Sequence, residues 1–347
     1  MKKLNLCALS LTLAMSSLLA ACSSNTETGQ AETASNEKSE GTKTIKIAHW
    51  YAADHVVNIA LNEKFKTLVE KNSNGSLKVD VYANSQLGGE EQMYDSVRAG
   101  TLEMAEIGVI MEPEVPKIGI LTLPYLFKDF NHAKETLFGE IGADIGAQLE
   151  EKTGLKFMGY GVNGFRVFSS NKPIEKIEDF QGFKVRMPNI PQMIAVGHSL
   201  DAVVTPMPIS EIFTALEQKV VDGQDNPYST LRSNTWYEVQ SHVLESRHMF
   251  LPNTLVANQK FWDSLSPEQQ KIVQDAIAES TAYEWELSEK SEQDDKKFLE
   301  EKGLKITVPD ENFRNQMIEA TSNIYESFYE KNAWGKEIVD KIKSLEK

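Results

Sequence analysis

Residues 44–49 read TIKIAH, residues 77–81 read LKVDV and residues 103–110 read EMAEIGVI. Apolar and polar side chains alternate along much of these three segments, which is typical of strands. The intervening residues 54–74 and 89–99 carry their apolar side chains at helical spacing. Strands that alternate with helices predict crossover connections and a parallel sheet. We therefore expect an α/β fold that begins at residue 44.

Local signals mark the expected helix ends. Asp54 is expected to cap the first helix, Asn74-Gly75 to end it, and Gly100 to stop the second. Three further helices are expected over residues 131–152 (with Gly142 and Gly146 as weak points), 191–200, and 210–219 (capped by Ser210). Further strands are expected over residues 155–158, 165–169, 183–186 and 202–205.

The strongest helix signal lies near the C-terminus. Ser266-Pro267-Glu-Gln269 combines a capping residue, a proline at the first helical position and a glutamine three residues after the serine. No helix breaker follows until Gly303, which predicts a helix of about 36 residues and roughly 54 Å. A helix of this length could brace two lobes. The alternative is two shorter helices with a bend.

Composition excludes some functions. The chain has 347 residues, 41% of them hydrophobic, which is enough for one large or two medium domains. Lys and Arg number 36 against 51 Asp and Glu, giving a net charge of −15. Nucleic-acid binding is therefore not expected, because it needs a basic surface. A bound anion would have to be held by local positive charge.

The N-terminus predicts export. Residues 1–21 have a charged start, an apolar stretch and small residues before Cys22, as a signal peptide does. The sequence Leu19-Ala-Ala-Cys22 resembles the lipobox of bacterial lipoproteins, so Cys22 is the expected lipidation site; an ordinary signal peptide is the alternative. Residues 22–43 are polar and small, and we expect a disordered tether. The expected location is extracytoplasmic, anchored to the cell membrane by lipid.

Two arginines are the candidate anion-binding residues. Arg166 ends Gly159-Tyr-Gly-Val-Asn-Gly-Phe-Arg166, and Arg186 lies in Gly182-Phe-Lys-Val-Arg186-Met-Pro188. A guanidinium group matches a carboxylate geometrically and keeps its charge. From the residues alone, a pocket for an organic anion and two structural salt bridges remain equally open. The glycines match G-x-G-x-x-G, but strand-like residues follow where a dinucleotide site needs a helix.

No other constellation indicates chemistry. The six histidines lack the i, i+4 spacing of a zinc-binding helix, and only two cysteines are present. Neither a metal nor a cofactor is expected. No nucleophile elbow occurs, and no pair of acids is marked as catalytic. We expect a binding protein rather than an enzyme; a secreted lipoprotein enzyme acting on an acidic substrate is the alternative.

Several ordered blocks carry a resemblance. They are Asn163-Gly-Phe-Arg166, Asp179-Phe-Gln-Gly182-Phe-Lys-Val-Arg186-Met-Pro188, Pro206-Met-Pro-Ile-Ser-Glu211 and Val221-Asp-Gly-Gln-Asp-Asn226-Pro227. Shorter matches are Ser85-Gln-Leu-Gly88, Leu123-Pro-Tyr125, Tyr237-Glu-Val-Gln240 and Asn258-Gln-Lys-Phe-Trp262. Together they resemble the solute-binding proteins of TRAP transporters, the DctP family. The resemblance covers about residues 44–340.

The resemblance implies roles for particular residues. Arg186 is expected to form the two-pronged salt bridge to the ligand carboxylate, with Arg166 and Asn226 as supporting contacts. Tyr51 and Glu90 are expected to line the opposite lobe. Two positions depart from other members: Gly108 stands where sialic-acid binders carry an acid, and Ile209 stands where an aromatic residue is common.

The resemblance also implies an architecture and partners. It implies a two-lobed, periplasmic-binding-protein-like α/β fold with a hinge and a long helix spanning both lobes. Lobe I would comprise residues 44–163 plus 252–285, and lobe II residues 164–251 plus 286–347. The implied ligand is a small organic acid, either a C4-dicarboxylate or a sugar acid. It would be delivered to the membrane subunits of a TRAP permease; an ABC-type binding protein is an alternative.

Overall fold

The computed structural model describes residues 41–345. The expected signal peptide, Cys22 and nearly all of the expected tether lie outside the described residues. No helix within residues 41–345 is both long and apolar enough to cross a membrane.

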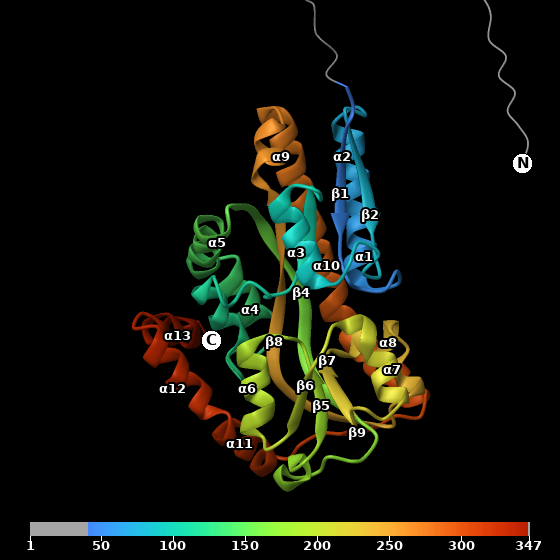
Figure 1. Cartoon of the computed structure of the whole chain (residues 1–347), viewed down its shortest axis with the longest axis vertical. Coiled ribbons are helices and arrows are strands. Elements are labelled where there is room, and N and C mark those ends of the chain that lie inside the picture. Colours follow the sequence, from blue (N-terminus) through green and yellow to red (C-terminus); the bar gives the residue numbers. More distant parts are fainter. Residues whose placement is uncertain (1–40, 346–347) are drawn as a thin grey trace, which may run out of the picture. The chain divides into compact units, whose positions relative to one another are not determined.

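The described residues form an α/β fold (Figure 1). The strands are β1 (Lys43–Ala48), β2 (Leu77–Tyr82), β3 (Met104–Ile107), β4 (Leu155–Ser170), β5 (Lys184–Met187), β6 (Val203–Pro206), β7 (Gly223–Asn226), β8 (His242–Asn258) and β9 (Lys305–Thr307). The helices are α1 (Val56–Ala60), α2 (Thr67–Asn72), α3 (Glu90–Ala99), α4 (Phe130–Leu137), α5 (Glu140–Thr153), α6 (Pro191–Ser199), α7 (Ile212–Glu217), α8 (Tyr228–Ser233), α9 (Gln259–Ser264), α10 (Pro267–Glu301), α11 (Glu311–Ala320), α12 (Ser322–Lys331) and α13 (Gly335–Ser344).

The strands form one sheet in the order β2-β1-β3-β8-β4-β7-β5-β6, with β9 beside β8. β4 and β8 are its longest strands and pair antiparallel from Leu155 opposite Asn258 to Ser170 opposite His242. β3 joins β8 near Ala257, whereas β7 joins β4 at the opposite end. Figure 1 shows both long strands running through the middle of the fold. They are therefore the shared frame for the strands at each end.

The middle of the β4–β8 ladder is irregular. Its register shifts between Val162 and Gly164, opposite Pro252 and Leu251. Gly164 has a φ of 107°, which L side chains rarely adopt. Pro252 has no N–H to donate to the ladder, so an irregular position suits it. These positions coincide with the expected lobe crossings near residues 163 and 252, although the lobe boundaries themselves stay a prediction.

The expected capping box is confirmed at the start of α10. α10 is one continuous helix of 35 residues, about 52 Å long. Ser266 accepts from the Gln269 N–H, and the Gln269 side chain accepts from the Ser266 N–H. α10 packs against β4, against α1 and against α8. The Trp285 indole donates to the Tyr160 carbonyl at 3.1 Å. The long bracing helix is thus confirmed, and the alternative of two shorter helices is wrong.

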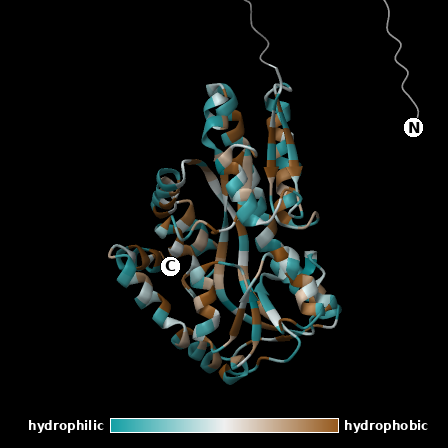
Figure 2. Ribbon diagram, in the orientation of Figure 1, coloured by the Kyte–Doolittle hydropathy of each residue, from teal (hydrophilic) through white to brown (hydrophobic). Residues whose placement is uncertain are grey.

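Hydrophobic residues gather where these elements meet. In Figure 2, β1 and β2 are largely brown, the long central strands mix brown with white and teal, and the outer helix faces are largely teal. One large apolar cluster includes Ile45 and Phe65, and a second includes Leu216 and Trp236. The second lies around α7, α8 and β8, which keeps that end of the sheet packed.

Several element predictions were wrong in detail. The first helix is capped by His55 instead of Asp54, and α7 begins after Glu211 without a side-chain cap from Ser210. Residues 131–152 form two helices that separate at Phe138 and Gly139. Residues 155–170 form one strand instead of two, and β8 was not expected at all.

The last helices contact the predicted first lobe. His132 Nε2 on α4 lies 2.8 Å from the Ile342 carbonyl on α13. Tyr325 on α12 donates to the Pro124 carbonyl at 2.7 Å. Residues 286–347, assigned to lobe II from the sequence, therefore reach back across the expected boundary.

Candidate functional site

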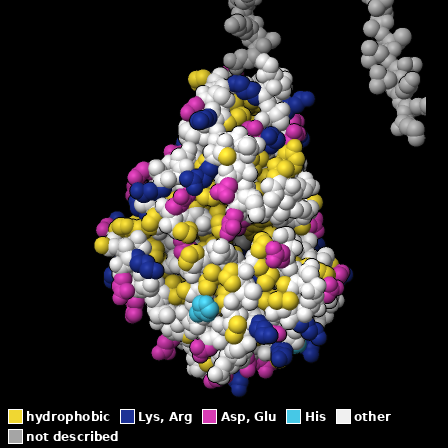
Figure 3. All heavy atoms as spheres, in the orientation of Figure 1, with side chains coloured by type: hydrophobic (Ala, Val, Ile, Leu, Met, Phe, Trp, Pro, Cys, Tyr) yellow, Lys and Arg dark blue, Asp and Glu magenta, His cyan; other side chains and the backbone are white. Residues whose placement is uncertain are grey.

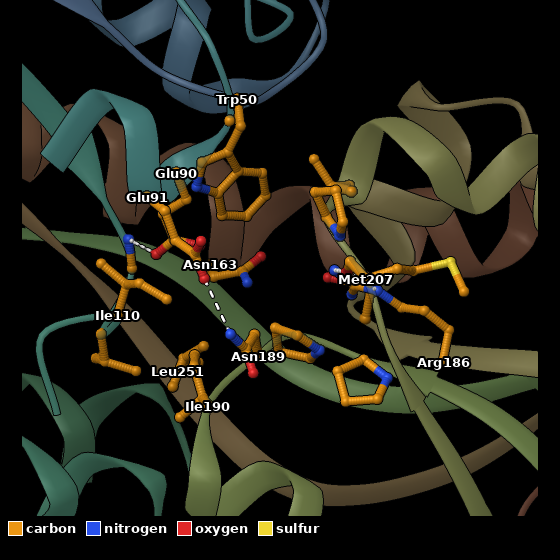
Figure 4. Close-up of a pocket in the computed structure, with 18 of the residues that line it drawn as sticks. Trp50, Glu90, Glu91, Ile110, Asn163, Arg186, Asn189, Ile190, Met207 and Leu251 are labelled. Atoms are coloured by element: carbon orange, nitrogen blue, oxygen red, sulfur yellow. Dashed lines mark hydrogen bonds between the residues drawn. The ribbon is translucent and has the colours of Figure 1, made fainter. Parts of the chain in front are cut away.

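A cavity of about 350 Å³ lies where loops from the two ends of the sheet meet. Trp50 and residues 89–92 and 108–110 line one part of it. Another part is lined by residues 188–190 and 206–209 together with Arg166, Arg186 and Asn226. Asn163 and Leu251, from the middle of β4 and β8, also line the cavity. Figure 4 draws 18 of the lining residues. Figure 3 shows one face of the molecule, with acidic side chains beside hydrophobic ones near its middle. The cavity is of a size that suits a small molecule.

Arg186 is a buried cation without a carboxylate partner. It lies on β5, between β6 and β7, and its side chain is almost fully buried. Its Nε and Nη2 donate to the Met207 carbonyl at 2.9 and 2.6 Å. No acidic side chain of residues 41–345 lies within ion-pair distance of it. Burial lowers the pKa of Arg186 to about 9, against the attraction of Asp225, so the group remains charged at neutral pH.

Arg166 has a different environment, because it is already paired. From β4, its Nε donates to Asp225 Oδ2 at 2.8 Å and its Nη2 to Asp225 Oδ1 at 3.1 Å. Both side chains are buried, and His248 Nε2 lies 3.3 Å from the same carboxylate. Burial alone would raise the pKa of Asp225, but the charge of Arg166 and the contact with His248 hold it well below its usual range. Arg166 thus combines a structural salt bridge with a place in the cavity wall.

Asn226, at the end of β7, is buried and lines the cavity. Its Nδ2 donates to Gln224 Oε1 at 2.7 Å, and Gln224 donates to Ser169 Oγ at 2.8 Å. This chain of hydrogen bonds fixes the Asn226 side chain beside the two arginines. The structure therefore brings Arg166, Arg186 and Asn226 together on one wall, as the sequence blocks predict.

Glu90, the first residue of α3, lines the cavity away from those three residues. Its Oε1 accepts from the Gly108 N–H at 2.8 Å. Burial raises the pKa of Glu90 to about 7, although the Gly108 hydrogen bond and the charge of Arg186 act against the rise. Ile209, which stands where an aromatic residue is common, also lines the cavity.

Tyr51 does not line the cavity. Its ring is fully buried between Trp50 and His55, with centroid distances of 3.6 and 4.1 Å, and its hydroxyl donates to Asn253 at 2.8 Å. The lining residue from this loop is Trp50. Adjacent side chains point in different directions here, and nothing in the sequence distinguished the two aromatic residues.

Sequence reasoning also missed two polar residues of the wall. Asn163 is buried, and its Nδ2 has no hydrogen-bond partner within residues 41–345. Asn189 donates to Glu91 at 3.1 Å, which links the loop after β5 to α3 (Figure 4). Asn163 belongs to a quoted sequence block, so its position was a usable signal. No group of three or more metal-ligating side chains within the described residues could hold a metal ion.

Comparison with known proteins decides the family. Residues 47–332 match the DctP family, described as bacterial extracellular solute-binding protein, family 7. The chain belongs to this family. The family binds solutes and is not a family of enzymes, so the enzyme alternative falls.

Solved DctP-family structures agree with the fold. A TRAP periplasmic solute-binding protein from Haemophilus influenzae RdAW with bound L-gulonate is 40% identical, with a TM-score of 0.85 over 88% of this chain and 100% of that one. The sugar acid binding protein DctPAm from Advenella mimigardefordensis, in complex with galactonate, is 31% identical, with a TM-score of 0.85 over 88% and 99% of the two chains. The expected periplasmic-binding-protein fold is thereby confirmed.

A curated DctP-family relative extends the range of ligands. The C4-dicarboxylate-binding periplasmic protein DctP of Rhodobacter capsulatus is 33% identical over 69% of this chain and 72% of its own length. DctP-family proteins similar to this chain therefore include binders of sugar acids and of dicarboxylates. Their periplasmic location confirms the expected extracytoplasmic location, whereas attachment by lipid stays a prediction.

Proposed function

We propose that this chain captures a small organic acid outside the cytoplasm, with Arg186 as the anchor for the ligand carboxylate. The single observation that carries the proposal is a buried, charged guanidinium in a cavity with no acidic partner of its own within residues 41–345. Two of its N–H groups go to the Met207 carbonyl, and an arginine has five. The remaining donors can hold a carboxylate.

In this proposal Arg166 and Asn226 support the anchor. Arg166 is neutralised by Asp225, so its contribution to an anion is smaller than that of Arg186. Asn226 is held by Gln224 and can direct its remaining amide N–H to a ligand oxygen. The ligand class is a sugar acid or a C4-dicarboxylate, as in the relatives with L-gulonate, galactonate and C4-dicarboxylates.

Delivery to a membrane permease completes the proposed function. Membership of the DctP family, with TRAP proteins among its similar structures, supports TRAP permease subunits as the partner. Lipidation of Cys22 would keep the protein at the membrane surface, in reach of that partner. Closure of the two predicted lobes around the anion would desolvate it and strengthen its contact with Arg186.

Calorimetry with an Arg186→Ala variant tests the anchor. Loss of one partner from a buried charge pair costs on the order of 2–5 kcal/mol, or roughly 30- to several-thousand-fold in affinity. The matched control is Arg98→Ala, which removes the same charge from an exposed pair with Glu114 and should leave affinity unchanged. Near-normal affinity in Arg186→Ala would contradict the proposal. Recovery of a chemically altered ligand would contradict a binding function.

A further inference from the structure

The charges that line the cavity are unequally available to a ligand. Arg166 and Arg186 are the lining cations, and Glu90 and Glu91 are the lining acids. Arg166 is already paired with Asp225, so Arg186 is the lining cation that has no carboxylate partner within residues 41–345. The wall therefore neutralises one ligand carboxylate. A second ligand carboxylate would meet no second unpaired cation.

The acid on the far wall is held in place by a glycine. Figure 4 shows Trp50, Glu90 and Asn163 on one side of the cavity and Arg186 with Met207 on the other. A Cβ added at Gly108 would lie 2.8 Å from Glu90 Oε1, so any side chain there would displace the carboxyl group. The second oxygen of Glu90 accepts no hydrogen bond from the described residues. Because Glu90 lines the cavity, this oxygen is a free acceptor in its wall.

Hydroxyl groups suit this wall better than a carboxylate does. A hydroxyl can donate to Glu90 and can also accept a hydrogen bond from a neighbouring donor. Asn163, whose Nδ2 has no partner within residues 41–345, lines the same cavity. A carboxylate only accepts, and its charge would be repelled by an ionised Glu90 in a poorly solvated site. The two walls thus differ in sign and in the ligand group that each prefers.

We infer that Glu90, placed by Gly108, makes this cavity selective for hydroxylated monocarboxylates against dicarboxylates. This inference rests on the proposed function, because it requires Arg186 to hold the ligand carboxylate. It goes further by naming the group at the far end of the ligand and the residue that selects it.

The charge state of Glu90 gives the selectivity a pH dependence. Burial raises the pKa of Glu90 to about 7, against the Gly108 hydrogen bond and the charges of Arg186 and Arg166, while neighbouring Glu91 adds to the rise. Above that pH the ionised group repels a second carboxylate. As the pH falls through 7 the group becomes neutral, so discrimination against dicarboxylates should weaken.

Titration calorimetry of the full-length protein tests the inference with L-gulonate, galactonate and succinate at pH 8. Glu90→Gln should bind the preferred sugar acid about tenfold more weakly and succinate about tenfold more tightly, because the charged acceptor is lost. Asp95→Asn is the matched control. It removes the same charge from an exposed position of the same helix that does not line the cavity, and it should leave the affinity ratio within about twofold.

A pH series adds a readout that a structural defect would not move. Between pH 8 and pH 6 the wild-type ratio should shift toward succinate, whereas the ratio for Glu90→Gln should stay flat. Tighter wild-type binding of succinate than of both sugar acids at pH 8 would overturn the inference. So would an equal change of the ratio in Glu90→Gln and Asp95→Asn.

The failure of the proposed function looks different. If the wild-type protein binds none of the three acids, or if Arg186→Ala binds them normally, both the anchor and the selectivity inference fall. If Arg186→Ala loses binding but Glu90→Gln keeps the wild-type ratio, only the selectivity inference falls.

Discussion

Removal of Arg166 should damage the fold more than it changes the anion anchor. Its guanidinium makes two hydrogen bonds to the carboxylate of Asp225 and a third to the Asp225 backbone carbonyl. Asp225 is fully buried, and Arg166 is only 2% exposed. Arg166→Ala would leave Asp225 as a buried charge with His248 as its remaining side-chain partner.

The expected size follows from that burial. Breaking a buried ion pair by removal of one partner costs about 3–5 kcal/mol, a large share of a typical unfolding free energy of about 5–15 kcal/mol. For about 300 ordered residues, an unfolding entropy of about 2.1 cal/mol/K per residue makes 1 kcal/mol correspond to roughly 1.5 °C in Tm, so the melting temperature should fall by roughly 5–8 °C. Arg98→Ala, at an exposed pair, should shift Tm by less than about 2 °C.

Urea unfolding of the ligand-free protein measures this loss directly. A double variant, Arg166→Met with Asp225→Leu, should recover much of the stability, because it removes both charges and leaves neither unpaired. The reasoning would be refuted if Arg166→Ala unfolded within about 0.5 kcal/mol of the wild type. A double variant no more stable than Arg166→Ala would also contradict it.

Two further predictions concern acids inside the fold and the exported N-terminus. Glu106 and Glu284 are buried together beside Tyr51, and neither is paired with a cation within residues 41–345. Burial raises the pKa of Glu106 to about 7 and raises the pKa of Glu284 well above its usual value. The folded state therefore keeps a proton that the unfolded chain loses, so the unfolding free energy should fall as the pH rises from about 4.5 to 7. Glu284→Gln should flatten this pH dependence and should be about 1–3 kcal/mol more stable than the wild type at pH 8 in urea titrations. If the pH dependence of the unfolding free energy is unchanged in Glu284→Gln, the two acids are not its cause. Cys22→Ala should move the protein from the membrane to the soluble fraction after cell fractionation, and retention in the membrane would exclude Cys22 as the anchor.

The parts of the fold that could be predicted were those with local signals. The alternation at residues 44–49, the stop at Gly100 and the capping box at Ser266 each depend on neighbours a few residues away. β8 has local features that disfavour a strand: Pro252 interrupts its sequence, and Arg247 adopts a φ of 43° within it. Its long antiparallel partner β4 overrides those local preferences.

The candidate site divides in the same way. The family blocks placed Arg166, Arg186 and Asn226 on one wall, as the structure does. They could not reveal that Asp225, 59 residues from Arg166, pairs with it, since chain spacing does not specify which side chains meet. Trp50 and Tyr51 are neighbours in sequence, but only Trp50 lines the cavity. The Tyr51 ring is held in the interior by its contacts with Asn253 and His55, which are not evident from the sequence.

The pairing of β3 with β8 constrains how the chain can fold. Residues 104–107 find their second neighbouring strand only at residues 254–257, about 150 positions later. The first half of the protein therefore exposes an unpaired sheet edge until the distant strand arrives, and such long-range pairing is slow. The sheet can therefore be completed only after residue 257 of the 347 has been synthesised.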